Sequence, residues 1–573
     1  MKRISLFLFL MGLLAGCKTP TAEPQPNTYC NPIDISYRFC LDEPSRREAA
    51  DPTVVWFKDR YFLFASKSGG YWHSKDLNGW LFIETNEIPV EEYAPTAVAI
   101  GDTLYFLASS NEKSTLYRST NPLSGQWEIA REELDQPVWD PAFFMDDDDR
   151  LYLYWGCSDV NPLYGIEIDY KNHFDFMGEP QVLVSSNPEK HGWEVSGDYN
   201  ELIDKRPWIE GAWMNKHNGL YYLQYSGPGT EFKSYSDGVY TSANPLGPYQ
   251  LAAHNPFACK PEGFAAGAGH GSTFKDVYGN YWHIGTITIS VKHMFERRLG
   301  LYPTFFDEEG MLYVNTRFGD YPLMMPTQKV SDFKELFPGW MLLSYNKSVE
   351  ASSSEDAYPA SNMTDENIRT YWTAMSGDSG EFAILDLQKL YDVFALQVNF
   401  AEHNTSVFGR QQDLFHRYIV ECSKDGDSWE MLIDRSRNQN DNSHAYVQLK
   451  EMVNCRFLKI TNLEVPDGCF AMSGFRVFGK GDGPQPDPVK NLEVVRNPDD
   501  RRSVNLSWKK SDHAIGYNIN YGGASNKLYH NYIVYQDTVL QINSLNADSP
   551  YCFTIESFNE NGMTDGEEVI RID

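Results

Sequence analysis

One pattern of residues occurs five times in the first half of the chain and constrains its fold more than any other feature. Each copy opens with small or polar residues, continues as an apolar strand, turns at Gly, Asn or Asp, and returns as an aromatic-rich strand. That order of segments predicts a β-hairpin. The copies are "DPTVVWFKDRYFLFAS" from 51, "APTAVAIGDTLYFLAS" from 94, "DPAFFMDDDDRLYLYWG" from 140, "EGAWMNKHNGLYYLQYS" from 210 and "GHGSTFKDVYGNYWHIGT" from 269.

The spacing of the copies indicates a β-propeller. Their first elements lie 43, 46, 70 and 60 residues apart, which is near or somewhat above the size of a four-stranded blade. Five such units between residues 30 and 335 predict a five-bladed β-propeller, whose innermost strands converge on a central channel. Helical periodicity is scarce throughout, so the chain of 573 residues is predicted to be all-β and to contain several domains.

The leading residues of the five copies are candidates for chemistry, because equivalent positions of different blades lie near one another. They are Asp51, Ala94, Asp140, Glu210 and His270. A single Asp before Pro is usually a turn residue, and a buried acid is costly unless it is paired or reactive. Three acids at one repeat position instead predict a carboxylate cluster with separated pKa values, as a general acid and a general base require.

The motifs "ADPTV", "WDPAFF", "IEGAW" and "GHGSTF", in this order and at these separations, resemble glycoside hydrolase family 43. Members are five-bladed propellers that hydrolyse glycosidic bonds with inversion, chiefly in α-L-arabinofuranosides and β-D-xylosides. The resemblance implies that Asp51 is the general base, that Glu210 is the general acid, and that Asp140 orients the acid and modulates its pKa. It places His270 where many members hold calcium through water; a structural, hydrogen-bonded histidine is the alternative.

Three tryptophans flank the proposed acids and are candidates for sugar binding. Trp139, Trp208 and Trp213 offer indole faces on which the apolar faces of sugar rings can lie, and core packing between blades is the alternative. One residue departs from the family pattern. Ala212 replaces the Pro that commonly follows the Glu-Gly of the acid motif, which bears on substrate more than on mechanism.

These features predict an inverting glycoside hydrolase that removes terminal arabinofuranosyl or xylosyl units from plant polysaccharide or oligosaccharide. A galactan- or galactofuranose-active relative is one alternative, and a non-catalytic surface glycan-binding protein is another. The complete set of base, acid and modulator favours the enzyme, and catalysis is expected to need no cofactor. A net charge of -30 argues against nucleic acid as a partner, because nucleic acid binding needs basic patches. The oligomeric state stays open.

The second part of the chain, residues 342–480, contains phrases such as "GEFAILDLQKLYDVFALQV" and "SGFRVFGKG". They resemble the discoidin-like, coagulation factor 5/8 C-type β-sandwich. The resemblance implies either a carbohydrate-binding module or a sandwich that simply packs against a catalytic domain. The segment around Asp365 and Thr370 is a candidate for a structural calcium ion, with an ordinary Asp or Asn turn as the alternative.

The last part, residues 487–573, follows the linker-like stretch "GDGPQPDPVKN". Trp508, Tyr517 and the run "LNADSPYCF", with Tyr551 placed as a tyrosine corner, resemble a fibronectin type III β-sandwich. No chemistry is assigned to this part. We expect it to act as a spacer or as a docking surface for a partner.

The N-terminus "MKRISLFLFLMGLLAGCK" has a basic start and an apolar run that is too short to span a membrane, so it predicts an export signal. The ending "LAGC" resembles a bacterial lipobox and implies cleavage before Cys17 and lipidation of its thiol. We therefore expect a signal peptide (1–17), a tether (18–29) and an exported, membrane-anchored bacterial lipoprotein. The other eight cysteines match no metal-ligand spacing, and whether Cys30 and Cys40 pair is left open.

Overall fold

The computed structural model describes residues 27–112, 114–411 and 413–573. Cys17, the lipobox and most of the proposed tether lie outside these ranges. The described residues form strands with four short 3-10 helices and no α-helix, which confirms the all-β class. Among them there is no helix long and apolar enough to cross a membrane. The 3-10 helices are η1 (Pro122–Ser124), η2 (Gly192–Glu194), η3 (Phe333–Glu335) and η4 (Ala360–Met363).

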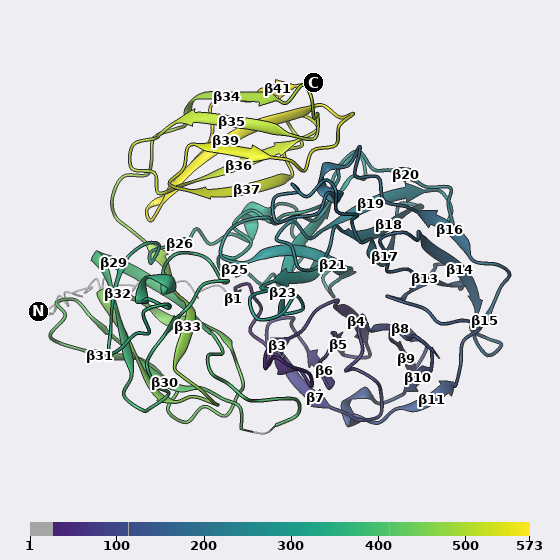
Figure 1. Ribbon diagram of the computed structural model, residues 1–573, viewed down its shortest axis with the longest axis horizontal. Coiled ribbons are helices and arrows are strands. Elements are labelled where there is room, and N and C mark those ends of the chain that lie inside the picture. Colours follow the sequence, from purple (N-terminus) through teal and green to yellow (C-terminus); the bar gives the residue numbers. More distant parts are fainter. Residues whose placement is uncertain (1–26, 113, 412) are drawn as a thin grey trace, which may run out of the picture.

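Five antiparallel sheets follow one another between residues 53 and 314 of the described chain, each built from consecutive strands (Figure 1). The strands of the first three sheets are β4 (Thr53–Phe57), β5 (Arg60–Phe64), β6 (Gly70–Ser74) and β7 (Leu81–Glu84); β8 (Thr96–Ile100), β9 (Thr103–Leu107), β10 (Leu116–Ser119) and β11 (Glu128–Arg131); β12 (Ala142–Met145), β13 (Leu151–Trp155), β14 (Leu163–Asp169), β15 (Asp175–Phe176) and β16 (Gln181–Val184). Those of the last two are β17 (Glu210–His217), β18 (Leu220–Gly227), β19 (Ser236–Ser242) and β20 (Gln250–Leu251); β21 (Ala266–Lys275), β22 (Tyr281–Thr288), β23 (Arg297–Phe306) and β24 (Leu312–Val314).

The first strands of these sheets form a closed ring. β4 contacts β8, β8 contacts β12, β12 contacts β17, β17 contacts β21, and β21 returns to β4. This is the arrangement of propeller blades around a channel. The five hairpins of the sequence repeat are the two inner strands of successive blades.

Two small sheets complete this half of the chain. β1 (Thr28–Tyr29) pairs with β25 (Leu323–Met324), so the start of the described chain is joined to a strand that follows the last blade. β2 (Arg38–Phe39) pairs with β3 (Arg47–Glu48) just before the first blade.

The second module is one hydrogen-bonded sheet of eight strands around a separate apolar core, which includes Trp372, Leu385, Val398 and Phe475. Its strands are β26 (Met341–Leu342), β27 (Ser348–Ala351), β28 (Trp372–Thr373), β29 (Phe382–Phe400), β30 (Arg417–Ser423), β31 (Glu430–Asp434), β32 (His444–Glu464) and β33 (Ala471–Lys480).

The third module has a three-stranded and a five-stranded sheet that enclose Trp508, Ile519 and Phe553. The hydroxyl of Tyr551 accepts a hydrogen bond from the backbone N–H of Asn546 at 3.0 Å, which ties this strand to the preceding turn. The strands are β34 (Lys490–Arg496), β35 (Val504–Lys509), β36 (Gly516–Gly522), β37 (His530–Tyr535), β38 (Val539–Ile542), β39 (Tyr551–Asn559), β40 (Gly562–Thr564) and β41 (Ile570–Ile572).

The three modules share buried contacts. One apolar cluster contains Phe318 of the propeller half, Phe478 of the second module and Phe558 of the third. Arg476 of the second module pairs with Glu366 at 2.9 Å and donates to the backbone oxygen of Asp320 in the propeller half at 2.6 Å. The hydrogen bond to Asp320 and the shared apolar cluster therefore join the modules.

The eight cysteines within the described residues are free thiols. Cys30 and Cys40 are both buried and are not joined to each other. Burial raises the pKa of the Cys30 thiol to about 12. Free buried cysteines behave as small apolar residues. The described cysteines therefore pack as part of the core and form no disulfide framework.

Candidate active site

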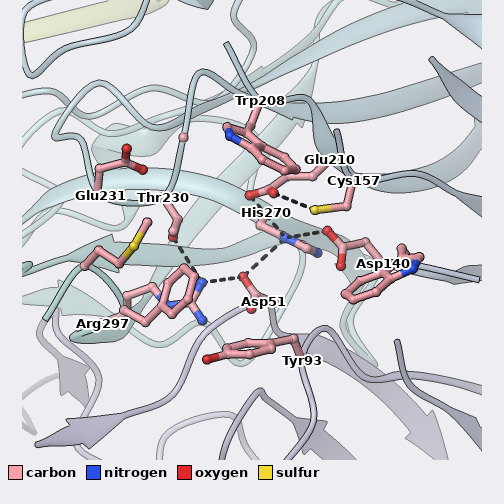
Figure 2. Close-up of a pocket in the computed structure, with 14 residues that line it drawn as sticks. Asp51, Tyr93, Asp140, Cys157, Trp208, Glu210, Thr230, Glu231, His270 and Arg297 are labelled. Atoms are coloured by element: carbon pink, nitrogen blue, oxygen red, sulfur yellow. Dashed lines mark hydrogen bonds and ion pairs between the residues drawn. The ribbon is translucent and has the colours of Figure 1, made fainter. Parts of the chain in front are cut away.

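A cavity of about 440 Å³ opens at the centre of the ring, and every blade contributes to its wall (Figure 2). Its lining joins segments that lie far apart in the sequence. The lining residues are Asp51, Tyr93, Trp139, Asp140, Cys157, Trp208, Glu210, Gly229, Thr230, Glu231, His270, Met294, Phe295 and Arg297.

The leading residues of the repeat share an unusual backbone conformation. The φ angles are 52° at Asp51, 45° at Ala94, 49° at Asp140 and 43° at His270, all in the left-handed region. In the fourth blade the positive φ, 62°, falls one residue later, at Gly211. Non-glycine residues rarely adopt such angles, and strain of this kind persists where the surrounding structure fixes it, often at functional sites.

In most copies the last residue holds the first residue of the next blade. In four of five cases a side-chain hydroxyl accepts the backbone N–H of that leading residue. Gly156 ends the third copy and has no hydroxyl, and the thiol of the adjacent Cys157 instead donates to Oε2 of Glu210 at 3.2 Å. The four bonds are Ala94 to Ser66 at 2.7 Å, Asp140 to Ser109 at 2.8 Å, His270 to Ser226 at 2.6 Å and Asp51 to Thr286 at 3.0 Å.

Asp51 lies in a strongly polar, buried environment. Its carboxylate accepts hydrogen bonds from Arg297 Nη1 at 3.0 Å and from Ser66 Oγ at 2.6 Å, and it lies 3.2 Å from His270 Nδ1. Burial alone would raise the pKa of Asp51, but the positive charges of Arg297 and His270 and the bond from Ser66 hold that pKa below its ordinary value. Asp51 is therefore a carboxylate at neutral pH.

Both carboxyl oxygens of Glu210 have hydrogen-bond partners. The hydroxyl of Tyr235 donates to Oε1, and the thiol of Cys157 donates to Oε2. The side chain of Glu210 is 13% exposed, against 4% for Asp51 and 6% for Asp140, so it is the most accessible acid of the three.

Asp140 is a buried acid with a raised pKa. Burial and the negative charges of Glu210 and Asp51 raise its pKa to about 7, although His270 and a hydrogen bond from Ser109 oppose the rise. The resemblance given by the sequence motifs implies that Asp140 modulates the pKa of Glu210. A pKa of about 7 means that Asp140 is about half protonated at neutral pH.

Asp140 also gives a prediction for stability. Because its pKa is about 7 in the folded protein and 3.8 ordinarily, the folded state keeps a proton that the unfolded chain has released between these values. The contribution of Asp140 to the free energy of unfolding therefore falls as pH rises from about 4 to about 7. We therefore compare the free energy of unfolding of Asp140→Asn with that of wild type. The difference should shift in favour of the variant by about 1–4 kcal/mol between pH 4 and pH 8.

Urea unfolding followed by circular dichroism at the two pH values measures this gain. Asp102→Asn, in the exposed turn between β8 and β9, is a matched control that changes an acid outside the cavity. An equal difference between Asp140→Asn and wild type at both pH values would show that Asp140 ionises normally.

His270 stands among the three acids. Its Nδ1 lies 3.2 Å from Asp51, 3.8 Å from Asp140 and 3.9 Å from Glu210 (Figure 2). Burial lowers the pKa of His270, but the surrounding carboxylates outweigh burial and raise it above its ordinary value. The imidazolium thus supplies positive charge at the centre of the acidic cluster.

Of the three predicted tryptophans, the structure brings two to the cavity. Trp139 and Trp208 line it and are 38% and 40% exposed, which leaves indole surface free for a ligand. Trp213 is not part of the lining. Its indole N–H donates to the backbone oxygen of Thr273 at 2.9 Å, between the fourth and fifth blades.

The site also contains three residues that no pattern in the sequence marks: Arg297, Tyr235 and Cys157. Arg297 also pairs with the buried Glu48 at 2.6 Å, so it is fixed on the side away from Asp51. None of these residues lies at a leading position of the repeat. The hydroxyl at the end of four of the five copies, in contrast, is visible in the sequence as a recurring Ser or Thr.

Two family models match the chain. Residues 45–312 match "Glycosyl hydrolases family 43" and residues 348–473 match "F5/8 type C domain". The segment that forms the propeller is therefore similar to family 43 glycosyl hydrolases, and the segment that follows it is similar to F5/8 type C domains. These matches confirm two of the three resemblances given by the sequence motifs.

Two curated proteins are similar to parts of the chain. A "Beta-D-galactofuranosidase xynD" from Aspergillus niger is 27% identical over 235 residues, which cover 35% of this chain and 62% of that protein. A "Beta-xylosidase" from Xylanibacter ruminicola is 26% identical over 132 residues, which cover 19% and 38%. The chain thus spans less than two thirds of the length of these relatives.

Solved structures show similarity at lower identity. A "Glycoside hydrolase" has a TM-score of 0.44 at 18% identity and covers 77% of this chain and 99% of its own. A thermostable family-43 glycoside hydrolase has a TM-score of 0.41 at 21% identity, with coverages of 53% and 100%. An endo-1,4-beta-xylanase from Bacteroides thetaiotaomicron has a TM-score of 0.39 at 21% identity, with coverages of 51% and 96%.

Proposed function

We propose that this protein is an inverting glycoside hydrolase. The observation that carries the proposal is the meeting of Asp51, Asp140 and Glu210, from three different blades, in one cavity that also has two exposed tryptophans. The family 43 domain match over the same segment supports it. A glycan-binding protein without activity would need the tryptophans, but it would not need a buried, ionised Asp51 beside an acidic pair.

Asp51 acts as the general base and Glu210 as the general acid. Inversion requires a carboxylate that activates water on one face of the sugar and an acid that protonates the leaving oxygen on the other. Asp51 is held ionised by Arg297, and Glu210 lies on the opposite side of His270 (Figure 2). Asp140 can hold a proton close to Glu210, because one carboxyl oxygen of Asp140, one of Glu210 and Sγ of Cys157 all lie within 4.8 Å of one another.

The substrates are terminal α-L-arabinofuranosyl or β-D-xylosyl units of plant polysaccharide or oligosaccharide, stacked on Trp139 or Trp208. A β-D-galactofuranoside is the second candidate, and the name of the Aspergillus niger relative favours it.

A panel of nitrophenyl glycosides tests the activity and the sugar together. It contains the α-L-arabinofuranoside, β-D-xyloside, β-D-galactofuranoside and β-D-galactoside. We expect one of the first three to be hydrolysed, with NMR showing that the first sugar released has the inverted anomeric configuration. Retention of configuration would contradict the proposed roles. Pull-down of plant polysaccharide without any released sugar would favour a binding protein.

The domain assignments extend the proposal. The propeller half is a five-bladed catalytic domain, residues 342–480 are a discoidin-like sandwich that packs on it, and residues 487–573 are a fibronectin type III domain. The Tyr551 bond to Asn546 supports the last assignment. Limited proteolysis with mass spectrometry tests the boundaries, because cleavage within these ranges before cleavage between them would contradict the division.

Calcium is proposed at two places, as a structural ion only. At the first place His270 would hold the ion through water, in the channel of the propeller. At the second place Asp365 accepts hydrogen bonds from the Thr370 hydroxyl at 2.6 Å and the Asn367 backbone at 3.0 Å. Atomic emission analysis of dialysed protein counts bound calcium, and a value of zero would remove both sites.

We also propose that the protein is exported and lipid-anchored at Cys17. The support is the signal-like sequence that ends in "LAGC". Detergent phase partitioning of the full chain and of Cys17→Ser tests the anchor. Recovery of both proteins in the aqueous phase would contradict it.

A further inference from the structure

The loop that joins β18 to β19, residues 229–235, touches both sides of the proposed chemistry. At one end Thr230 lines the cavity, and its hydroxyl accepts a hydrogen bond at 3.0 Å from Arg297 Nη1, the same nitrogen that holds Asp51. At the other end the hydroxyl of Tyr235 donates to Glu210. The position of this loop therefore affects the surroundings of both the base and the acid.

The middle of loop 229–235 is held from outside the propeller. Arg369 of the second module donates from Nη2 to the backbone oxygen of Glu231 at 3.3 Å and from Nη1 to Oδ2 of Asp198 at 2.6 Å. Asp198 in turn accepts the backbone N–H of Lys233 at 2.9 Å on its other oxygen. Arg369 and Asp198 thus fasten the loop at two points, and the planar fork of arginine suits such a double contact.

The segment that carries Arg369 is itself anchored on the propeller. The backbone N–H of Ile368 donates to the oxygen of Phe264 at 2.9 Å. The Ile368 side chain is buried in an apolar cluster with Phe264, Ala265, Ile287 and Ile289. The backbone next to Arg369 is therefore fixed on the propeller. The Arg369 side chain is only 20% exposed.

We propose that Arg369 is a positioning residue, through which the F5/8 type C domain holds loop 229–235 and so sets the placement of Glu210 and Asp51. The second module then helps to position residues that line the active site. The kinetic consequence rests on the proposed function, whereas the structural consequence for the loop does not.

Arg369→Ala and a control, Arg456→Ala, test the proposal in the full-length protein. Arg456 makes a comparable two-bond pair with Asp386, at 2.7 and 2.8 Å, between two strands of the second module. Hydrogen exchange followed by mass spectrometry should show peptides covering 229–235 exchanging about 10-fold faster or more in Arg369→Ala. The control should leave these peptides unchanged.

On the best substrate of the glycoside panel, Arg369→Ala should lower kcat about 10- to 100-fold with a smaller change in KM, because small misplacements of reacting groups are costly. Arg369→Lys keeps the charge but not the fork, so its kcat should lie between that of Arg369→Ala and wild type. The double variant Arg369→Ala/Asp198→Asn should have a kcat close to that of Arg369→Ala alone, since both changes release the same loop.

The two parts of the experiment separate the possible failures. If wild type hydrolyses no glycoside, the proposed function fails, and exchange in loop 229–235 still decides whether Arg369 holds the loop. Unchanged exchange in Arg369→Ala overturns the inference whatever the activity. Faster exchange with wild-type kcat overturns the link to catalysis, and equal losses in Arg456→Ala reduce the effect to general destabilisation.

Discussion

Replacing Glu210 by Gln is expected to lower kcat about 10²- to 10⁴-fold on glycosides with poor leaving groups, the range that general acid catalysis typically supplies. Gln has nearly the same size and can still accept the hydrogen bond that Tyr235 donates to Oε1. It has no acidic proton to give to the glycosidic oxygen. The loss should therefore appear in the chemical step and not in folding.

The leaving group makes this prediction specific. A 2,4-dinitrophenyl glycoside departs without protonation, so Glu210→Gln should recover most of its rate on that substrate. Steady-state rates for nitrophenyl and dinitrophenyl glycosides of one sugar measure the recovery. Glu128→Gln is a control on an exposed strand, where the side chain is 69% exposed. Wild-type turnover of the nitrophenyl substrate by Glu210→Gln would exclude Glu210 as the acid.

The parts of the site that sequence could predict are those that the repeat marks. Asp51, Asp140, Glu210 and His270 occupy one position of a pattern that recurs, and a closed ring of sheets must bring such positions together. Their shared cavity follows from the periodicity alone. Trp139 was predictable as the neighbour of a leading residue, and it does line the cavity.

The parts that sequence could not predict depend on contacts across long separations. Arg297 lies 246 residues from Asp51, and nothing in the repeat connects them. The same holds for Arg369, which meets Glu231 across 138 residues and from another module. Trp213 was predicted to bind sugar because it is close to Glu210 in sequence, but it does not line the cavity. Strand alternation turns its side chain toward Thr273.

The sequence also could not predict the charge states of the acids, because each charge state depends on burial and on all neighbouring groups together. Asp140 has a raised pKa and Asp51 a lowered one, although both are buried aspartates that precede proline at the same repeat position. The difference arises from Arg297, which contacts Asp51 directly. A sequence shows that several acids meet, but it does not show which of them has a cation beside it.

Asp51→Asn is expected to lower kcat by a similar factor, about 10²- to 10⁴-fold, for a different reason. Asn retains the shape and can accept the hydrogen bond from Ser66, but it cannot take a proton from the attacking water. Arg297 keeps its pair with Glu48 at 2.6 Å, so the guanidinium stays satisfied and the fold should tolerate the change. The melting temperature, measured by circular dichroism, checks that tolerance.

The dinitrophenyl substrate separates the two acids. Its leaving group needs no protonation, yet an inverting reaction still requires an activated water, so Asp51→Asn should stay slow where Glu210→Gln recovers. Added formate should restore part of the rate in Asp51→Gly, in which a small carboxylate can enter the space left by the side chain. If Asp51→Asn recovered on the dinitrophenyl glycoside as Glu210→Gln does, the base would have to be another carboxylate, and Asp140 would be the next to replace.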